Sequence, residues 1–167
     1  MKVDLNNKEY KKIVGYIFKN KRFMEISNYH HHGTDRLTHS IRVSYFSYKL
    51  AKSLKLDYKS AAIGGLLHDF FHEIKEETTL DCIKAQYNHP KKAAENALYY
   101  FKVSPKIVNI IETHMFPLTY KPSKYLEGWI VSFIDKMVGT YEYGLKFKYQ
   151  FSLWAVFLSN LLMIKIK

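Results

Sequence analysis

Cysteine, proline and glycine are scarce in this chain, and each shortage excludes a class of protein. The single cysteine, Cys82, can form neither an intramolecular disulfide nor a thiolate metal cluster. This fits a reducing, cytoplasmic compartment. Four prolines and seven glycines in 167 residues argue against a turn-rich β-sandwich. The length suits one domain, and the composition predicts an all-α fold.

Long hydrophobic runs are also lacking. The most apolar stretch, FSLWAVFLSNLLMI at 151–164, falls short of the roughly 18–20 residues that span a bilayer. We therefore predict a buried terminal helix there and no membrane span. The first residues, MKVDLNNKEYKK, have no apolar core of a secretory signal. The aromatic-rich tail from Tyr141 onward could complete the core or pack against a second subunit, so a homodimer stays open.

Acidic residues are outnumbered: 15 Asp and Glu stand against 26 Lys and Arg, which leaves a formal charge of +11. Such an excess attracts phosphorylated metabolites, nucleotides or nucleic acid by long-range steering. The alternative is that many lysines only solvate helix faces. No RNA- or DNA-binding motif is present, so a small phosphorylated partner is favoured over nucleic acid.

What the chain does contain is helical periodicity from one end to the other. We treat residues 1–167 as a single domain, with a core at about 29–143. Gly64 and Gly65, in the middle of an apolar helix, indicate close packing. Thr38 is expected to cap a helix, and Pro90 and Pro105 to occupy first turns. The helices are expected at 8–26, about 38–50, 58–68, 79–86, 90–101, 105–114, 124–144 and 148–164.

The dipeptide His68-Asp69 ends the apolar stretch AAIGGLL, and imidazoles and carboxylates are ligands for first-row divalent metals. Asp135 lies within WIVSFIDKMV, where an unpaired charge would be costly to bury. Its alternative is a pair with Lys136 on an exposed edge. His114 shares an apolar helix face with three isoleucines. A metal centre explains the whole set together: His39, His68, Asp69, His89, His114 and Asp135.

Three segments resemble the HD-domain superfamily: RLTHS at 36–40, GLLHDFF at 65–71 and FIDK at 133–136, within about 29–143. The resemblance implies an all-helical bundle. It also implies a divalent metal, Mn, Fe, Co, Ni, Mg or Zn, on His39, His68, Asp69 and Asp135. His89 and His114 match the extra histidines of binuclear members, in which the aspartate of the dipeptide bridges two ions.

Two departures from the family patterns limit what the resemblance implies. HDFFHE is followed by neither the Gly-Tyr-Pro signature nor the lysine of cyclic di-GMP phosphodiesterases, so that activity is not implied. His114 is followed by Met115 where some members carry paired histidines. One metal and two metals therefore both remain open.

The resemblance implies a phosphohydrolase, a phosphatase or phosphodiesterase, that acts on a nucleotide or other small phosphoester through a metal-activated water. Asp69 would orient or deprotonate the water. Arg36, one turn before His39, is expected at the mouth of the site, with Lys136 as a second phosphate-binding cation. Two alternatives remain: an HD-fold di-iron oxygenase with the same ligand set, and a non-catalytic nucleotide-binding module.

Overall fold

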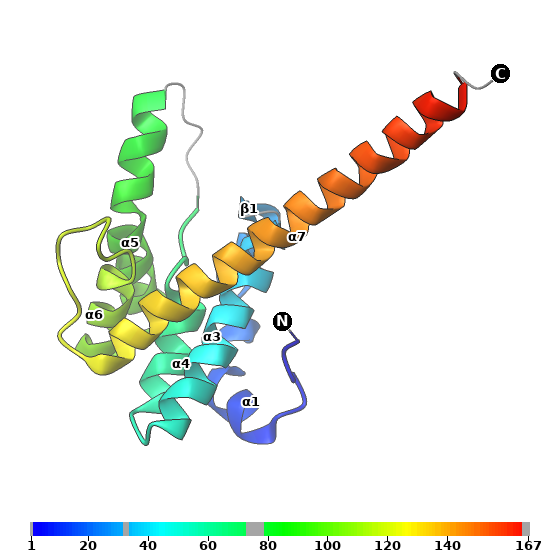
Figure 1. Ribbon diagram of the computed structural model, residues 1–167. Coiled ribbons are helices and arrows are strands. Elements are labelled where there is room, and N and C mark those ends of the chain that lie inside the picture. The colour runs from blue at the N-terminus through cyan, green and yellow to red at the C-terminus, as the bar shows by residue number, and fades with distance from the viewer. Residues whose placement is uncertain (1, 32–33, 73–78, 165–167) are drawn as a thin grey trace.

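The structure, a computed structural model, describes residues 2–31, 34–72 and 79–164. Helices dominate it (Figure 1), and the all-α prediction is confirmed. A two-residue antiparallel pair, His30–His31 (β1) with Thr34–Asp35 (β2), is the sheet that these residues form. The helices are α1 (Lys8–Val14), η1 (Ile17–Lys19), α2 (Lys21–Met24), η2 (Glu25–Asn28), α3 (Arg36–Ser53), α4 (Tyr58–Leu67), α5 (Thr79–Phe101), α6 (Pro105–Thr113) and α7 (Leu126–Ile164).

Helices α3 and α4 form the centre of the body, and α7 crosses them. A Cβ at Gly65 would lie 3.0 Å from Ser44 Cα on α3, and one at Gly64 would lie 2.6 Å from Ile110 Cγ2 on α6. The expected close packing at these glycines is therefore confirmed. Because α4 carries no side chain at this contact, its C-terminal end comes close to the backbone of α3.

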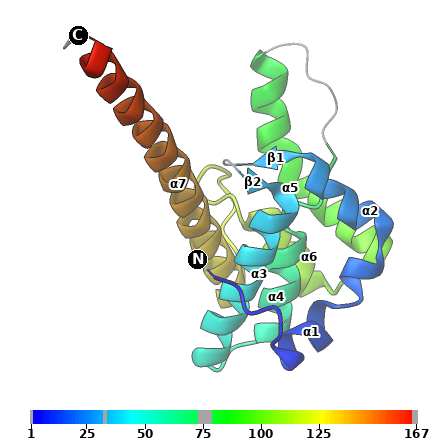
Figure 2. The ribbon, with the colours of Figure 1, turned by 90° about the vertical axis from the view of Figure 1, so that its right-hand side faces the viewer.

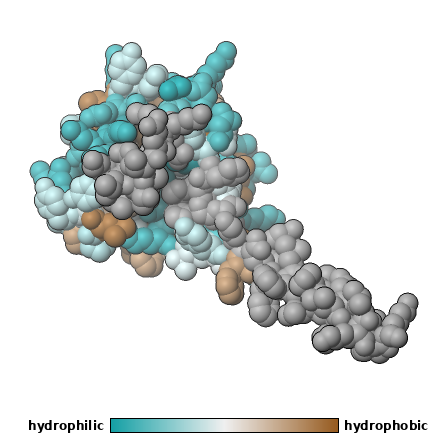
Figure 3. Space-filling view, turned by 90° about the horizontal axis from the view of Figure 1, so that it is seen from above, coloured by the Kyte–Doolittle hydropathy of each residue, from teal (hydrophilic) through white to brown (hydrophobic). Residues whose placement is uncertain are grey.

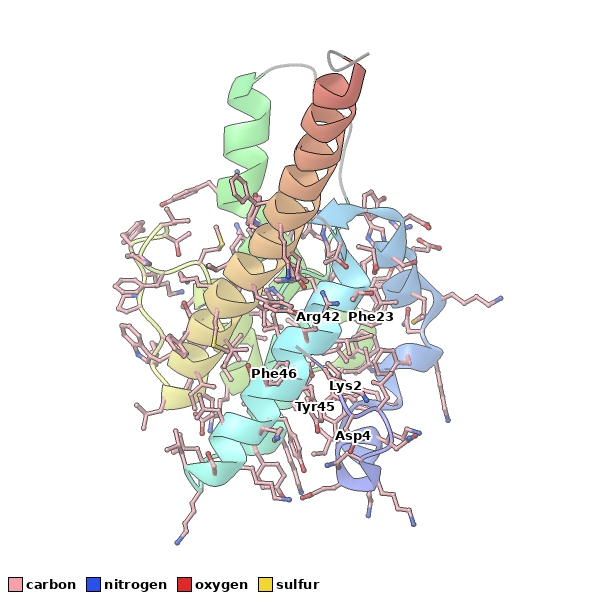
Figure 4. All side chains as sticks on the ribbon, turned by 45° about the vertical axis from the view of Figure 1, so that its right-hand side comes forward. Lys2, Asp4, Phe23, Arg42, Tyr45 and Phe46 are labelled. Atoms are coloured by element: carbon pink, nitrogen blue, oxygen red, sulfur yellow. The ribbon has the colours of Figure 1, made fainter. Side chains whose placement is uncertain are left out.

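Two apolar clusters cover opposite sides of α3. The larger one joins α3 and α4 to the N-terminal segment, where Tyr10 meets Tyr45 edge-on at 5.2 Å between ring centroids. The smaller one joins α3, α4 and α6 to α7 and includes Val43, Val131 and Ile134. Tyr45 and Phe46, adjacent on α3, can be followed in Figure 4. The candidate metal ligands lie on the helices of this body or directly after their C-terminal ends.

Three helix predictions were wrong in their extent. The segment 8–26 is not one helix, because α1 stops at Gly15 and the side chain of Asn20 starts α2 by accepting from Phe23 N. Residues 79–101 form one helix with Pro90 inside it. Pro90 has no amide hydrogen to donate one turn back, so α5 continues through it with one backbone hydrogen bond fewer. Pro105 does begin α6, as expected.

The C-terminal prediction also needs correction. Residues 126–164 form one helix, and its second half runs away from the helical body in both ribbon views (Figures 1 and 2). At 1.5 Å per residue, the part beyond Glu142 extends the helix by about 33 Å. Its backbone therefore continues beyond the other helices, as part of α7 and not as the separate helix expected at 148–164, and the predicted burial of its side chains lies outside what the structure describes. No glycine or proline after Gly144 offers a break at which the chain could fold back.

The surface described in Figure 3 is mostly hydrophilic or neutral, with hydrophobic residues in small separate patches. Among the described residues, we find no helix long and apolar enough to cross a membrane.

Candidate metal centre

All six candidate ligands meet in one place, although they come from five helices or their ends. His39 lies on α3, His89 on α5 and Asp135 on α7. His68 and His114 are the C-cap residues of α4 and α6, and Asp69 follows His68 directly. Their donor atoms fall into three overlapping groups, each within 4.8 Å: His39, His68 and Asp69; His68, His114 and Asp135; and Asp69, His89 and His114.

Two of the histidines also cap their own helices. His68 Nδ1 donates to Gly65 O at 2.9 Å, and His114 Nδ1 donates to Ile111 O at 2.7 Å. Each bond caps the C-terminal end of its helix, and Ile111 O also accepts from the amide of His114. A carbonyl can only accept, so the proton lies on Nδ1 and the Nε2 atom of a neutral ring presents its lone pair to the site.

His39 is held between two carboxylates of α7. Its Nε2 lies 3.0 Å from Asp135 Oδ1, and its Nδ1 donates to Glu142 Oε2 at 2.8 Å. Burial alone would lower the pKa of His39, but the bonds with Asp135 and Glu142 raise it to about 9. Without a metal, a proton therefore occupies the position between His39 and Asp135 that a cation would take.

The Asp69 carboxylate faces two sets of histidines. Its Oδ2 lies 3.5 Å from His68 Nε2, while its Oδ1 lies 3.3 Å from His89 Nε2 and 3.7 Å from His114 Nε2. One oxygen thus belongs with the His68 side and the other with the His89 and His114 side. This is the arrangement that a carboxylate bridging two ions requires.

The charges around these donors favour a cation. Two carboxylates converge here, and α4 and α6 direct their C-termini, which carry partial negative charge, toward the site. His68 Nε2 is buried, has no hydrogen-bond partner among the described residues, and lies 3.5 Å from Asp135 Oδ1. Burial and the neighbouring His68 and His89 lower the pKa of His114 to about 3, so this ring stays neutral.

The spacing of the donors fits the same conclusion. Neighbouring ligands on an ion with bonds of about 2.1 Å stand roughly 3.0–3.4 Å apart. The contacts of His39 with Asp135 (3.0 Å), His89 with Asp69 (3.3 Å) and His68 with either aspartate (3.5 Å) lie at or near that range. The residues present therefore suit one or two divalent metal ions.

A cavity of about 270 Å³ opens beside the donors. Lys136 lines it, but its ammonium donates to His114 O at 3.2 Å and to Ser132 O and Oγ at 3.2 and 2.7 Å. Burial lowers the pKa of Lys136, with nearby Asp135 opposing the shift. Lys136 thus adds positive charge to the cavity while tying α6 to α7. The lining consists of Asp69, His89, His114, Met115, Leu118, Asp135, Lys136, Gly139, Thr140 and Tyr143.

Arg36 does not line this cavity. Its side chain is buried, its guanidinium carbon lies 3.9 Å from the centroid of the Phe71 ring, and its Nη1 donates to Phe71 O at 2.9 Å. Arg36 therefore holds the segment that follows the dipeptide, rather than standing at the mouth of the described cavity as the sequence suggested.

The sequence reasoning missed Glu142. It is buried on α7, and the hydrogen bonds from His39 and Arg42 lower its pKa although burial acts to raise it. A usable signal was present, since Glu142 follows Asp135 by seven residues, two helical turns, and so shares its helix face. Tyr143 and Leu118, which line the cavity, carried no comparable pattern.

Comparison with known proteins supplies one match. The family model of the HD domain matches residues 36–139, well over half of the chain. That range begins just before His39 and ends just after Asp135, so it includes all six candidate ligands. No curated protein sequence and no solved structure matches the chain. With the helical fold and the cluster of histidines and aspartates, this match shows that the chain belongs to the HD-domain family.

Proposed function

We propose that this protein is a metal-dependent phosphohydrolase that acts on a small phosphoester, with a nucleotide as the favoured class. The observation that carries the proposal is the convergence of imidazole Nε2 atoms on the oxygens of Asp69 and Asp135, beside an open cavity. Donor atoms so placed stay close together only around a cation or a proton. Membership of the HD-domain family supports the same chemistry.

The residues divide between two ions in this proposal. His39, His68 and Asp135 would hold the first, His89 and His114 the second, and Asp69 would bridge both. When bound, such ions lower the pKa of a coordinated water and polarise a phosphoryl oxygen. Asp69 accepts a hydrogen bond from the attacking water and orients it toward the cavity. The Nδ1 protons of His68 and His114, bound to helix carbonyls, keep both rings in the required tautomer.

The cavity supports a small anionic substrate. Lys136 provides positive potential at the wall of the cavity, and Met115 and Leu118 provide apolar contact for the leaving group of the substrate. The chain's excess of basic residues would draw phosphorylated molecules toward the site. The low cysteine content supports a cytoplasmic setting for the enzyme.

The test is hydrolysis of p-nitrophenyl phosphate, its bis-ester and nucleoside 5′-monophosphates by metal-stripped protein reloaded with Mn²⁺, Co²⁺ or Ni²⁺. We expect chelation to abolish turnover and reloading to restore it. Asp69→Asn keeps the shape but loses the charge, and should lower kcat by at least about 100-fold. Asp4→Asn, an exposed aspartate of the N-terminal segment, is the matched control and should leave kcat unchanged.

Two results would overturn the proposal. Iron-loaded protein that shows a mixed-valent paramagnetic signal and substrate-dependent O₂ uptake would be an oxygenase instead. Nucleotide binding without turnover at full metal occupancy would indicate a binding module.

A further inference from the structure

Glu142 and Asp135 bind the two ring nitrogens of the same histidine. Both are on α7 and point to one face, with Asp135 Oδ1 at 3.0 Å from His39 Nε2 and Glu142 Oε2 at 2.8 Å from Nδ1. The His39 side chain is fully buried and that of Glu142 nearly so. The orientation of the His39 ring is therefore set from both sides by a single helix.

His39 needs this outside partner more than the other histidines do. His68 and His114 stand at helix C-termini, where a carbonyl of their own helix is free to accept the Nδ1 proton. His39 stands near the start of the 18-residue helix α3, whose carbonyls accept the amides of the following turn. A side chain from another element must therefore accept its Nδ1 proton, and Glu142 does so.

Arg42 fixes the other oxygen of this carboxylate. Its Nη1 donates to Glu142 Oε1 at 2.5 Å, and it lies three residues after His39, one turn along the same face of α3. Figure 4 labels Arg42 on α3 near the crossing with α7. Helix α3 thus supplies a donor to each Glu142 oxygen, which leaves the carboxylate one orientation.

We propose that Glu142 is a positioning residue for the metal centre, which holds the Nδ1 proton of His39 so that Nε2 presents its lone pair to the ion beside Asp135. The inference rests on the proposed metal-dependent function. A negatively charged acceptor behind a ligating imidazole raises its basicity as well as fixing its tautomer, and loss of such a partner commonly costs about 10- to 100-fold in metal affinity.

The experiment measures Co²⁺ affinity of the metal-stripped full chain from the d–d absorption of the bound ion, with metal content after dialysis as a second readout. Glu142→Ala should weaken binding at one site by about 10- to 100-fold. Glu142→Gln retains an oxygen that can accept the Nδ1 proton, so it should recover most of this loss. It also serves as the informative variant if Glu142→Ala fails to fold by circular dichroism.

Glu127→Ala is the matched control for a purely structural role. Glu127 is also a buried glutamate of α7, but it accepts from Asp57 N at 2.9 Å and pairs with Lys106 at 3.0 Å and contacts no candidate ligand, so its Co²⁺ affinity should stay within about threefold of wild type. Equal losses in Glu127→Ala and Glu142→Ala would overturn the inference, as would wild-type affinity in Glu142→Ala. Wild-type protein that binds Co²⁺ but hydrolyses no phosphoester would overturn the proposed function alone, because the readout here is binding.

Discussion

His89 Nε2 lies 3.1 Å from His114 Nε2, closer than two uncharged ring nitrogens with facing lone pairs can rest. The Nδ1 proton of His114 is already donated to Ile111 O. The contact is satisfied either by a His89 ring that carries its proton on Nε2 and donates it to His114, or by a cation between the rings; Asp69 Oδ1 lies 3.3 Å from His89 Nε2.

This pair predicts how many ions bind. His89→Ala and His114→Ala should each reduce the metal content from two ions per chain to one, since the donors around His39 and Asp135 remain in place. Elemental analysis of freshly dialysed protein measures the number of metal ions per chain. His72→Ala is the matched control, because His72 contacts Arg22 O and the Tyr29 ring outside the cluster. One ion per chain in wild type and in both variants would show a mononuclear site.

A second prediction concerns the glycine contact between α4 and α3. A Cβ at Gly65 would press on Ser44 backbone atoms at 3.0–3.2 Å, so Gly65→Ala should destabilise the metal-free protein by about 1–3 kcal/mol. Gly144→Ala is the opposite case: nothing lies within 4 Å, so the helix propensity of alanine should stabilise α7 by about 0.5–1 kcal/mol. Urea unfolding measures both. The same change in the free energy of unfolding for both variants would mean that α4 can move away from α3 without a loss of stability.

A third prediction concerns acid stability. Hydrogen bonds from Lys52 and Tyr48 lower the pKa of Glu9 from 4.5 to about 2. A depressed carboxyl pKa contributes stability above about pH 4.5 that is lost as the pH falls toward 2. The difference in urea midpoint between wild type and Glu9→Gln should therefore be largest at pH 6 and shrink by pH 3.

The Glu9 effect should be small and weaken in 1 M NaCl, because the carboxylate is exposed and salt screens it. A gap in midpoint that stays constant from pH 6 to pH 3 would argue against the hydrogen bonds as its cause. Metal content should not change in Glu9→Gln, since Glu9 lies on α1, away from the candidate ligands.

A fourth prediction separates the two basic residues named from the sequence. Lys136→Met removes the positive charge that lines the cavity and should raise KM for a phosphomonoester about fivefold, equivalent to about 1 kcal/mol of attraction. Arg36→Lys should instead lower the melting temperature with little change in KM, because a lysine cannot both stack on Phe71 and reach its carbonyl in the same way. A raised KM in Arg36→Lys with an unchanged KM in Lys136→Met would instead indicate that Arg36 binds the substrate.

Much of the candidate site could be predicted from the sequence because its residues interrupt apolar helix faces. Asp135 among apolar neighbours and His68-Asp69 after AAIGGLL carry that signal, and the family resemblance connected them to His39. For Glu142 the sequence offered only the seven-residue spacing from Asp135, because a glutamate between two tyrosines near the end of the predicted helix 124–144 is typical of a surface residue. Only the crossing of α7 over α3 reveals that it is buried against His39 and Arg42.

The helix boundaries were harder to predict, for reasons that differ between segments. Asn20 acts as an N-cap inside an otherwise periodic stretch, and its side-chain bond to Phe23 N outweighs the pattern. Pro90 suggested a helix start, whereas it lies inside α5, because the loss of one backbone hydrogen bond at a proline does not always end a helix. For residues 126–164, periodicity indicated helices but not whether the chain would bend between them.

His39 and Asp135 are separated by 96 residues in the chain, and a metal held by both would act as a cross-link between distant parts of it. A covalent link that closes a loop of about 100 residues stabilises a fold by about 4–5 kcal/mol, through the entropy it removes from the unfolded chain. A metal ion that stayed coordinated by both residues would close the same loop and so lower the entropy of the unfolded chain in the same way. A protein with one cysteine would thereby gain a reversible substitute for the disulfide it cannot form.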